Sequence, residues 1–174
     1  MGVQVRLAVE HDLAGVADAT ARAYADFVLG PEDPYLDRLR DAAGRAREAH
    51  LWVAVEDDRV LGSVTDCPPG SSWREVARPD EGEFRMLAVD PAAAGRGVGR
   101  LLMQQVLDAW RARGARAVAL STLPDMAPAH RLYERFGFVG DPRRDWSPAP
   151  GVELLVYELV LGSAPGPGVT PAAP

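Results

Sequence analysis

The stretch that decides the fold reads EFRMLAVDPAAAGRGVGRLLMQQVLDAW and spans residues 83–110. Its first part, Phe84–Val89, is a short and mostly apolar run that stops at Asp90-Pro91, which predicts a strand. Its last part predicts a helix, because apolar residues recur there at helical spacing, at Val98, Leu101, Leu102, Val106, Ala109 and Trp110.

The turn between these two elements, Gly95–Arg100, is suited to bind an anion. Its three glycines leave the backbone uncovered, and the helix that follows directs unpaired N–H groups and the positive end of its dipole at the same place. Arg96 and Arg100 add positive charge. We therefore expect this turn to hold a pyrophosphate, with a flexible strand-to-helix connection as the alternative.

Two common phosphate-binding motifs do not fit the turn. A dinucleotide-binding turn requires G-x-G-x-x-G, but Arg100 or Leu102 stands where the third glycine belongs. A P-loop requires Gly-Lys-Ser/Thr, whereas this chain has Gly99-Arg100-Leu101. The sequence therefore excludes both motifs.

A third motif fits better. The run Leu87–Pro91 followed by Ala94–Gly99 resembles motif A of the GNAT family of N-acetyltransferases, Leu-x-Val-x-Pro and then Arg/Gln-x-x-Gly-x-Gly, with Ala94 in place of the Arg or Gln. Residues Met126–Phe138 resemble motif B, Asn-x-x-Ala-x-x-Leu-Tyr-Glu-x-x-Gly-Phe, with Met126 in place of the Asn. Both motifs stand in the family's order and spacing, and the resemblance covers about Val3 to Val160.

The resemblance implies an α/β protein with the GNAT fold, a central mixed and mostly antiparallel β-sheet flanked by helices. The apolar patterns along the chain predict strands at Val3–Val9, Leu51–Val55, Val60–Thr65, Phe84–Val89, Ala115–Ser121, Phe138–Gly140 and Val152–Val160. They predict helices at Leu13–Phe27, Pro34–His50, Val98–Trp110 and Asp125–Phe136. Three segments remain as loops that could shape an acceptor pocket, Tyr24–Tyr35, Ser71–Asp80 and Asp141–Gly151.

The resemblance also implies acetyl-CoA as co-substrate and assigns roles to several residues. The glycine turn would hold the phosphates, through Gly95, Arg96, Gly97, Val98, Gly99 and Arg100. Backbone N–H groups of the preceding strand would hold the pantetheine arm and the thioester carbonyl, at Leu87, Ala88 and Val89. The Tyr133 hydroxyl would protonate the CoA thiolate, the alternative being a core aromatic on a helix.

The family resemblance does not identify the general base that would deprotonate the amine. Ribosomal-protein alanine acetyltransferases place a glutamate at the end of the strand before motif B, but this chain has Ser121 there, which cannot serve. We expect Glu83, the usual acidic position on the motif A strand, to act through a water molecule. Glu81 and water alone are alternatives as the base, and the other interpretation of Glu83 is a solvated glutamate at the strand edge.

Composition limits the kinds of partner, cellular location and metal site that we expect for this protein. A formal net charge of −6 argues against nucleic acid as the main partner. The N-terminus has no signal-peptide pattern and no apolar run reaches the ~18 residues of a membrane helix, so we expect a cytoplasmic protein without a membrane partner. The three histidines are scattered, which predicts no metal site. Cys67, the single cysteine, is expected to be a small buried or loop residue rather than a carrier of the acetyl group.

The sequence therefore predicts an acetyl-CoA-dependent N-acetyltransferase that moves an acetyl group directly to a primary amine. We expect a small-molecule amine, with a peptide or protein amine as a second possibility. The alternatives are a GNAT-fold acyl-CoA-binding module with little activity, suggested by Ala94 and Met126, and an interaction domain without a nucleotide ligand. A homodimer through the C-terminal strands is a further expectation from the family resemblance.

The domain is predicted to span residues 1–161, followed by a disordered tail at residues 162–174 that is rich in Pro, Gly and Ala. Such a composition cannot bury a core. Truncation after Leu161 should therefore leave the melting temperature within a few degrees, because a loss of ~1 kcal/mol shifts it by ~2–4 °C in a domain of this size. Thermal unfolding of the truncated and full chains makes the comparison, and a larger drop shows that the tail packs on the domain.

Overall fold

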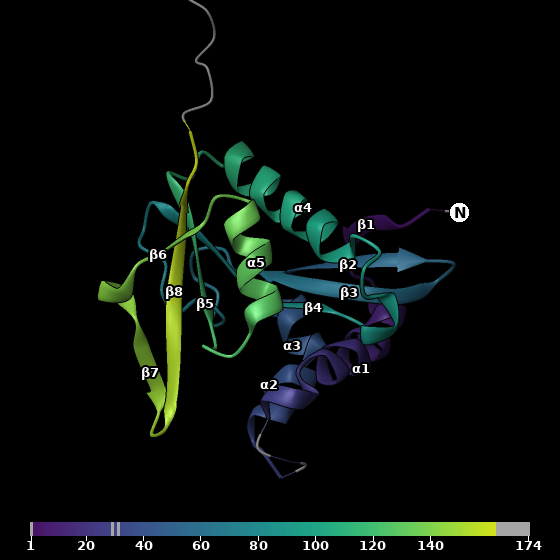
Figure 1. Cartoon of the computed structure of the whole chain (residues 1–174). Helices are drawn as coiled ribbons and strands as arrows, with labels where there is room; N and C mark the ends of the chain where they lie inside the picture. The colour runs from purple at the N-terminus through teal and green to yellow at the C-terminus, as the bar shows by residue number, and fades with distance from the viewer. Residues whose placement is uncertain (1, 29, 31, 163–174) are drawn as a thin grey trace, which may run out of the picture.

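One open sheet of eight strands carries helices on both of its faces (Figure 1). The computed structural model describes residues 2–28, 30 and 32–162, so the predicted tail, apart from Gly162, lies outside the described residues. The strands are β1 Gln4–Leu7, β2 His50–Glu56, β3 Arg59–Asp66, β4 Glu81–Val89, β5 Ala117–Thr122, β6 Val139–Gly140, β7 Trp146–Ala149 and β8 Val152–Val160. The helices are α1 Leu13–Ala23, α2 Tyr35–Arg40, α3 Ala42–Glu48, α4 Val98–Ala112 and α5 Ala127–Arg135.

The sheet is mixed and mostly antiparallel, as predicted. Its strand order is β1-β2-β3-β4-β5-β8-β6, with β7 paired to β8 outside this path. Every pair in the described part is antiparallel except β4 and β5, which run parallel over the pairs Glu81–Ala117 to Glu83–Ala119. Beyond Glu83 no further β4–β5 pair forms, so the sheet opens between these two strands.

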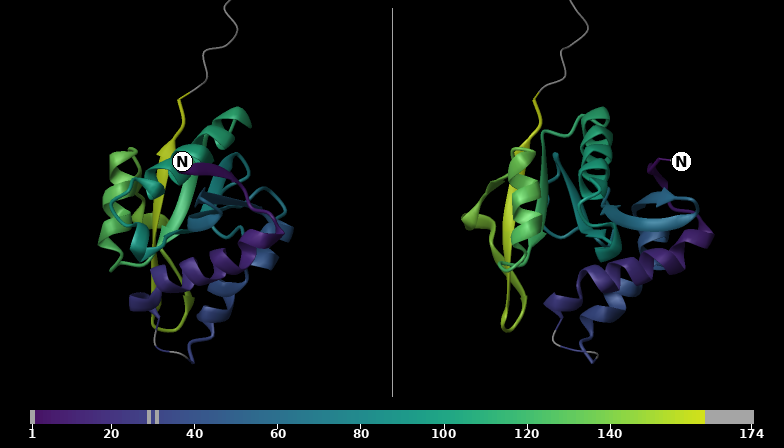
Figure 2. Two further views of the ribbon diagram at one scale, coloured as in Figure 1. Left: turned by 90° about the vertical axis from the view of Figure 1, so that its right-hand side faces the viewer. Right: turned by 45° about the vertical axis from the view of Figure 1, so that its right-hand side comes forward.

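The helices form two layers on opposite faces of the sheet. A Cβ placed on Gly62 of β3 would lie 3.1 Å from Val98 and 3.3 Å from Leu102 of α4. The next residue, Ser63, has its hydroxyl 3.5 Å from that of Thr20 of α1. Because successive strand residues point to opposite faces, α4 and α1 cover opposite sides of β3. Figure 2 shows the same separation, with α1–α3 grouped away from α4 and α5.

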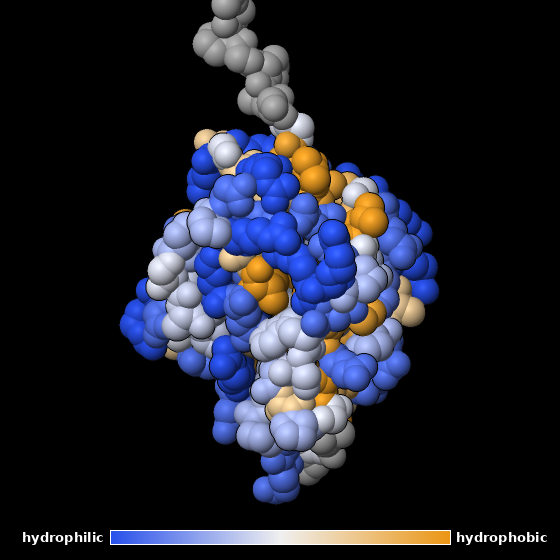
Figure 3. All heavy atoms as spheres, turned by 90° about the vertical axis from the view of Figure 1, so that its left-hand side faces the viewer, coloured by the Kyte–Doolittle hydropathy of each residue, from blue (hydrophilic) through white to orange (hydrophobic). Residues whose placement is uncertain are grey.

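The face that carries the C-terminal strands is mostly hydrophilic, with small separate hydrophobic areas (Figure 3). Among the described residues of the C-terminal strands, Val139 of β6 and Val160 of β8 are exposed apolar residues, at 70% and 63%. Single exposed valines are ordinary on a protein surface and do not by themselves mark an interface.

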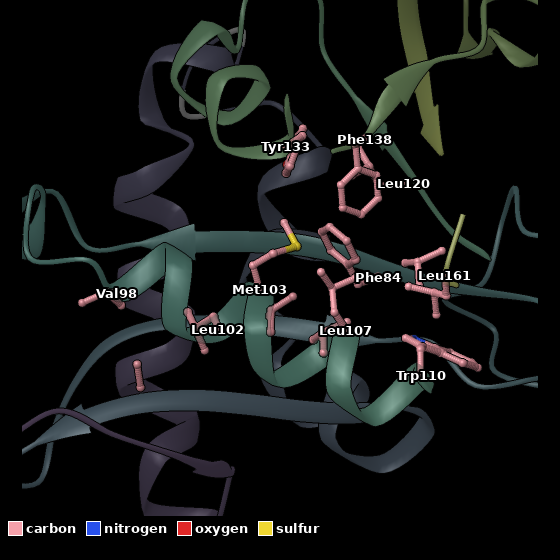
Figure 4. Packing of buried hydrophobic residues seen from close by; sticks show 14 of the residues in the cluster. Phe84, Val98, Leu102, Met103, Leu107, Trp110, Leu120, Tyr133, Phe138 and Leu161 are labelled. Atoms are coloured by element: carbon pink, nitrogen blue, oxygen red, sulfur yellow. The ribbon is translucent and has the colours of Figure 1, made fainter. Parts of the chain in front are cut away.

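The main core lies between α4 and the sheet (Figure 4). The predicted helical periodicity is confirmed, since α4 buries Val98, Leu102, Met103, Val106, Leu107 and Trp110. Met103 and Leu107 complete this face, whereas Leu101 and Ala109, which were predicted to belong to it, are only partly buried. Beneath them lie Phe84 of β4, Leu120 of β5 and the aromatic rings of Tyr133 and Phe138.

Two predicted elements are corrected by the structure. The helix expected at Pro34–His50 is two helices, because Asp41 leaves the helical conformation (ψ 62°) and its carboxylate accepts a hydrogen bond from the Gly44 N–H at 2.8 Å, which starts α3. The segment Asp141–Gly151 was expected to be a loop, but it contains β7. This strand includes Pro148 and lacks an apolar alternation, so only its pairing with β8 identifies it.

A glycine at the strand–helix contact generates a stability prediction. A Cβ on Gly82 of β4 would lie 2.3 Å from the Trp110 ring of α4, which is too close for any side chain. We expect Gly82→Ala to cost about 1–3 kcal/mol by overpacking and to lower the melting temperature by several degrees. The matched control is Gly2→Ala, where an added Cβ has no neighbour within 4 Å. Equal melting temperatures for the two variants would show that the Trp110 ring moves aside without cost.

Candidate active site

The opening in the sheet begins at a bulge in β4. Met86 has a φ of 51°, which is rare for a non-glycine residue, and the β3–β4 register shifts between the pairs Thr65–Arg85 and Ser63–Ala88. The Asp90 N–H donates to Leu61 O of β3 at 2.9 Å. Because strand N–H groups alternate in direction, those of Leu87 and Val89 then point to the side that β5 has left. Of the three residues predicted to hold the ligand through their backbone, Leu87 and Val89 therefore present N–H groups at the opening, whereas the N–H of Ala88 faces β3.

The glycine turn lies at the beginning of α4. Gly95 and Gly97 have φ values of 77° and 78°, in the left-handed region that favours glycine, and a Cβ on either would meet open space. Gly97 is the N-cap of α4 and supplies no side-chain hydrogen bond, so the first N–H groups of the helix lack a capping side chain. The turn therefore presents backbone donors and a helix dipole to a ligand.

A groove of about 580 Å³ lies over this turn. Its lining comes from the end of β4, from α4 and from the facing side of α5. Six of the residues predicted to bind the cofactor line it, namely Val89, Gly95, Gly97, Val98, Gly99 and Arg100. The other lining residues are Ala93, Ala94, Gln104, Leu132, Arg135 and Phe136.

Only one of the two arginines predicted from the sequence brings positive charge to the groove. Arg100 lines the groove, but Arg96 turns away and its Nη2 lies 2.7 Å from both carboxylate oxygens of Glu56. A second arginine, Arg135 of α5, lines the groove instead. Sequence reasoning missed Arg135 because it stands at a variable position of motif B, and only the packing of α5 beside α4 brings it here.

Tyr133 lies on the inner side of α5, where it is 5% exposed. Its ring packs edge-to-face on Phe84 of β4 and beside Phe138 (Figure 4). Burial raises the pKa of its hydroxyl well above the usual value, although a hydrogen bond with Thr122 opposes the shift. The hydroxyl is therefore protonated at neutral pH, which a proton donor requires, and the ring is at the same time part of the core.

Glu83 is not a solvated strand-edge residue, because it is 1% exposed. Its carboxylate accepts backbone hydrogen bonds of 2.9 to 3.1 Å from Glu75, Val76 and Ala77. These residues belong to the loop that precedes β4. The interpretation as a solvated glutamate was therefore wrong, and the carboxylate predicted to act as base ties this loop to the end of the β4–β5 ladder.

Glu81, the alternative base, is also fully engaged. It lies 2.7 Å from Arg116 and 2.8 Å from Arg144, and it accepts a hydrogen bond from the Arg78 N–H at 2.9 Å. Burial alone would raise the pKa of Glu81. The hydrogen bonds from the Arg78 N–H and from Arg144 outweigh it and lower the pKa below the usual value for glutamate. A carboxylate with a lowered pKa is a poor acceptor of a further proton at neutral pH.

The two departures from the family motifs have different local consequences. Ala94 lines the groove without a polar side chain, where the family usually has Arg or Gln. Met126 is the N-cap of α5 and makes no side-chain cap, where the family usually has Asn. An Asn at such a position would stabilise the helix by about 1 kcal/mol, so the loss at Met126 concerns helix stability as well as any contact with a ligand.

Within residues 2–28, 30 and 32–162, no group of three or more His, Cys, Asp and Glu side chains could hold a metal ion. In the same part of the chain, no helix has both the length and the apolar character needed to cross a bilayer.

Comparison with known proteins identifies the family of this chain. A sequence model of the Acetyltransferase (GNAT) family matches residues 16–138. The chain belongs to this family. A mycothiol acetyltransferase of Beutenbergia cavernae is 41% identical over 154 residues, which cover 71% of this chain and 52% of that protein. This GNAT chain thus spans about half the length of these curated relatives.

Solved structures share the fold of this GNAT protein. A GNAT-family protein from Desulfovibrio desulfuricans superposes with a TM-score of 0.72 and 24% identity, covering 91% of this chain and 99% of the other. YncA of Salmonella typhimurium, solved with its cofactor acetyl-CoA, gives a TM-score of 0.67 and 20% identity, covering 98% and 100%. At these identities the likeness concerns the fold.

The groove generates a binding prediction. We expect Gly97→Glu to weaken acetyl-CoA binding by at least 100-fold, or about 2.7 kcal/mol, because the new carboxylate enters the groove and repels phosphate. Gly114→Glu is the matched control, since Gly114 has a similar φ of 73° and open space around it but lies at the other end of α4. Calorimetry on the two folded variants measures the difference. Equal affinities would place the ligand elsewhere.

Proposed function

We propose that this protein is an acetyl-CoA-dependent N-acetyltransferase that moves the acetyl group directly to a primary amine of a small molecule. The observation that carries the proposal is the continuity of two features: the groove at the start of α4 meets the opening between β4 and β5 through Val89. An anionic ligand at the helix terminus can therefore extend along the open edge of β4 toward the bulge at Met86.

The residues present fit acetyl-CoA. Uncapped N–H groups of α4 and the open glycines Gly95 and Gly97 suit the pyrophosphate, and Arg100 and Arg135 add charge. When bound, acetyl-CoA supplies an activated acetyl thioester. The N–H groups of Leu87 and Val89 would hold its carbonyl oxygen, where negative charge develops during transfer.

The proposed transfer forms a C–N bond and breaks the C–S bond of the thioester. The amine nitrogen attacks as the neutral base, so its ammonium form must first lose a proton. Tyr133 gives its phenolic proton to the departing sulfur and regains one later from solvent. Direct transfer is further supported by Cys67, whose thiol is fully buried and whose pKa is raised by burial and by Glu83, so it is a poor acetyl carrier.

A small-molecule amine is the acceptor that we propose, with a peptide or protein amine as the second possibility. A homodimer through the C-terminal strands and a cytoplasmic location also remain part of the proposal. No helix able to cross a bilayer was found in the described part of the chain, and the net charge of −6 disfavours nucleic acid.

A release assay tests the function as a whole. Free CoA thiol is measured with acetyl-CoA and a panel of primary amines, namely amino acids, an amino sugar, a polyamine and short peptides. Turnover with any of them supports the enzyme. Tight acetyl-CoA binding without any turnover favours the acyl-CoA-binding module, and the absence of acetyl-CoA binding rejects both.

Tyr133→Phe tests the proton donor. The substitution removes only the hydroxyl, so packing on Phe84 and affinity for acetyl-CoA should barely change, while kcat should fall by ~10²–10⁴-fold. Tyr157→Phe is the matched control, because its ring lies 6.1 Å from that of Tyr133 in the same aromatic group. Steady-state CoA release at saturating acetyl-CoA gives kcat. Full turnover in Tyr133→Phe would return Tyr133 to a purely structural role.

A further inference from the structure

A polar cluster lies on the face of the sheet opposite α4 and α5. It joins Tyr24 at the end of α1, Tyr35 and Arg38 of α2, Arg85 of β4 and Glu75 of the loop before β4. We call these five residues the acceptor-face cluster. Tyr24 and Tyr35 pack partly buried against an apolar group that includes Met86, so the cluster borders the bulge.

Glu75 is the carboxylate of this cluster that reaches solvent. Its side chain is 21% exposed, and its Oε1 lies 2.8 Å from Arg85 Nη1 and 3.9 Å from Arg38 Nη2. The backbone N–H of the same residue donates to Glu83. Glu83 thus fixes the backbone of Glu75 at the end of the β4–β5 ladder, while the side chain extends along β4 to Arg85, next to Met86.

The cluster and Tyr133 contact neighbouring residues of β4, since the Tyr133 ring packs on Phe84 and Glu75 pairs with Arg85. Burial is the main cause that raises the pKa of the Tyr24 hydroxyl, and charges on Tyr35 and Tyr133 add to it. The pKa of Tyr35 is in turn raised mainly by burial and also by Glu75. Because successive strand residues point to opposite faces, Glu75 and the predicted proton donor lie on opposite faces of β4, just beyond the point where β5 leaves it and where an acceptor and a thioester would meet.

We propose that Glu75, not Glu83, is the general base of the reaction. This inference rests on the proposed function. The Glu75 carboxylate takes one proton from the acceptor ammonium, directly or through one water. The freed nitrogen lone pair forms the C–N bond, the C–S bond electrons leave on sulfur, and sulfur takes the Tyr133 proton. Glu83 is a positioning residue that holds the loop carrying Glu75.

The surroundings of Glu75 suit this role. Burial raises its pKa above the usual value for glutamate, against the opposing effect of Arg85 and Arg38, which makes it a stronger base than a solvated carboxylate. A third arginine lies behind the cluster. Arg45 is fully buried, bonds to Thr20, Thr65 and Leu39 O, and forms no salt bridge within the described residues. This excess positive charge disfavours an ammonium ion and favours the neutral amine.

Glu75→Gln is the variant that tests the proposal, assayed with the panel amine that wild type acetylates fastest. We expect kcat/KM to fall by ~10²–10⁴-fold with acetyl-CoA affinity unchanged. The pH profile is the decisive readout. Wild-type kcat/KM should fall as the pH drops through the raised pKa of Glu75, because the base becomes protonated, and this acidic limb should be absent in Glu75→Gln. The groups facing Glu75 that could shift the limb are Arg38, Arg85, Tyr35, Cys67 and Glu83.

Three further variants separate catalysis from structure. Glu75→Asp should retain part of the activity and the acidic limb, since it keeps a carboxylate. Glu83→Gln should lower the melting temperature but keep the acidic limb, because it loosens the loop without removing the base. Glu48→Gln is the matched control, since its carboxylate contacts Ser72 of the same loop outside the cluster, and it should behave as wild type.

The possible results are distinct. A wild-type rate and acidic limb in Glu75→Gln would overturn the proposal, and loss of the limb in Glu83→Gln alone would return the role to Glu83. A wild-type protein that binds acetyl-CoA but acetylates none of the amines overturns the proposed function itself, and this inference with it.

Discussion

The divergence of β4 from β5 is the constraint on which the rest of the structure depends. The two strands pair only as far as Glu83 and Ala119, and after the bulge at Met86 the N–H groups of Leu87 and Val89 point away from β3, to the side that β5 has left. Unpaired strand edges are normally covered, so an edge left open beside a groove is typical of a ligand site. On one face the opening meets the glycine turn of α4, and on the other it meets the acceptor-face cluster.

Buried carboxylates keep this opening in place. Glu83 holds the loop before β4 by three backbone N–H groups, and Glu81 is shared by arginines of three segments. Arg144, 10% exposed, also donates to Val76 O and so joins the segment before β7 to the same loop. Removing one partner from such a buried network costs far more than breaking a surface pair. These acids therefore shape the site, and the loop that they fix presents Glu75.

The two sides of the opening differ in their electrostatics although the whole chain carries −6. The groove side relies on a helix dipole, Arg100 and Arg135, which act locally on an anion. The other side combines Glu75 with Arg38 and Arg85, a pairing that holds a proton acceptor next to charges that disfavour an ammonium ion. One sheet thus separates binding of an anionic donor from deprotonation of an amine.

The sequence by itself determined the strand, the glycine turn and the amphipathic helix α4, and through both motifs the family. These features follow from rules that act over a few residues, such as the left-handed φ at Gly95 and Gly97 and the apolar periodicity of α4. Tertiary structure alone decided the side-chain partners: Arg96 pairs with Glu56, Arg135 enters the groove, and Glu83 closes on the loop before β4. Each of these partners depends on which distant segments pack together, and a local pattern cannot encode that.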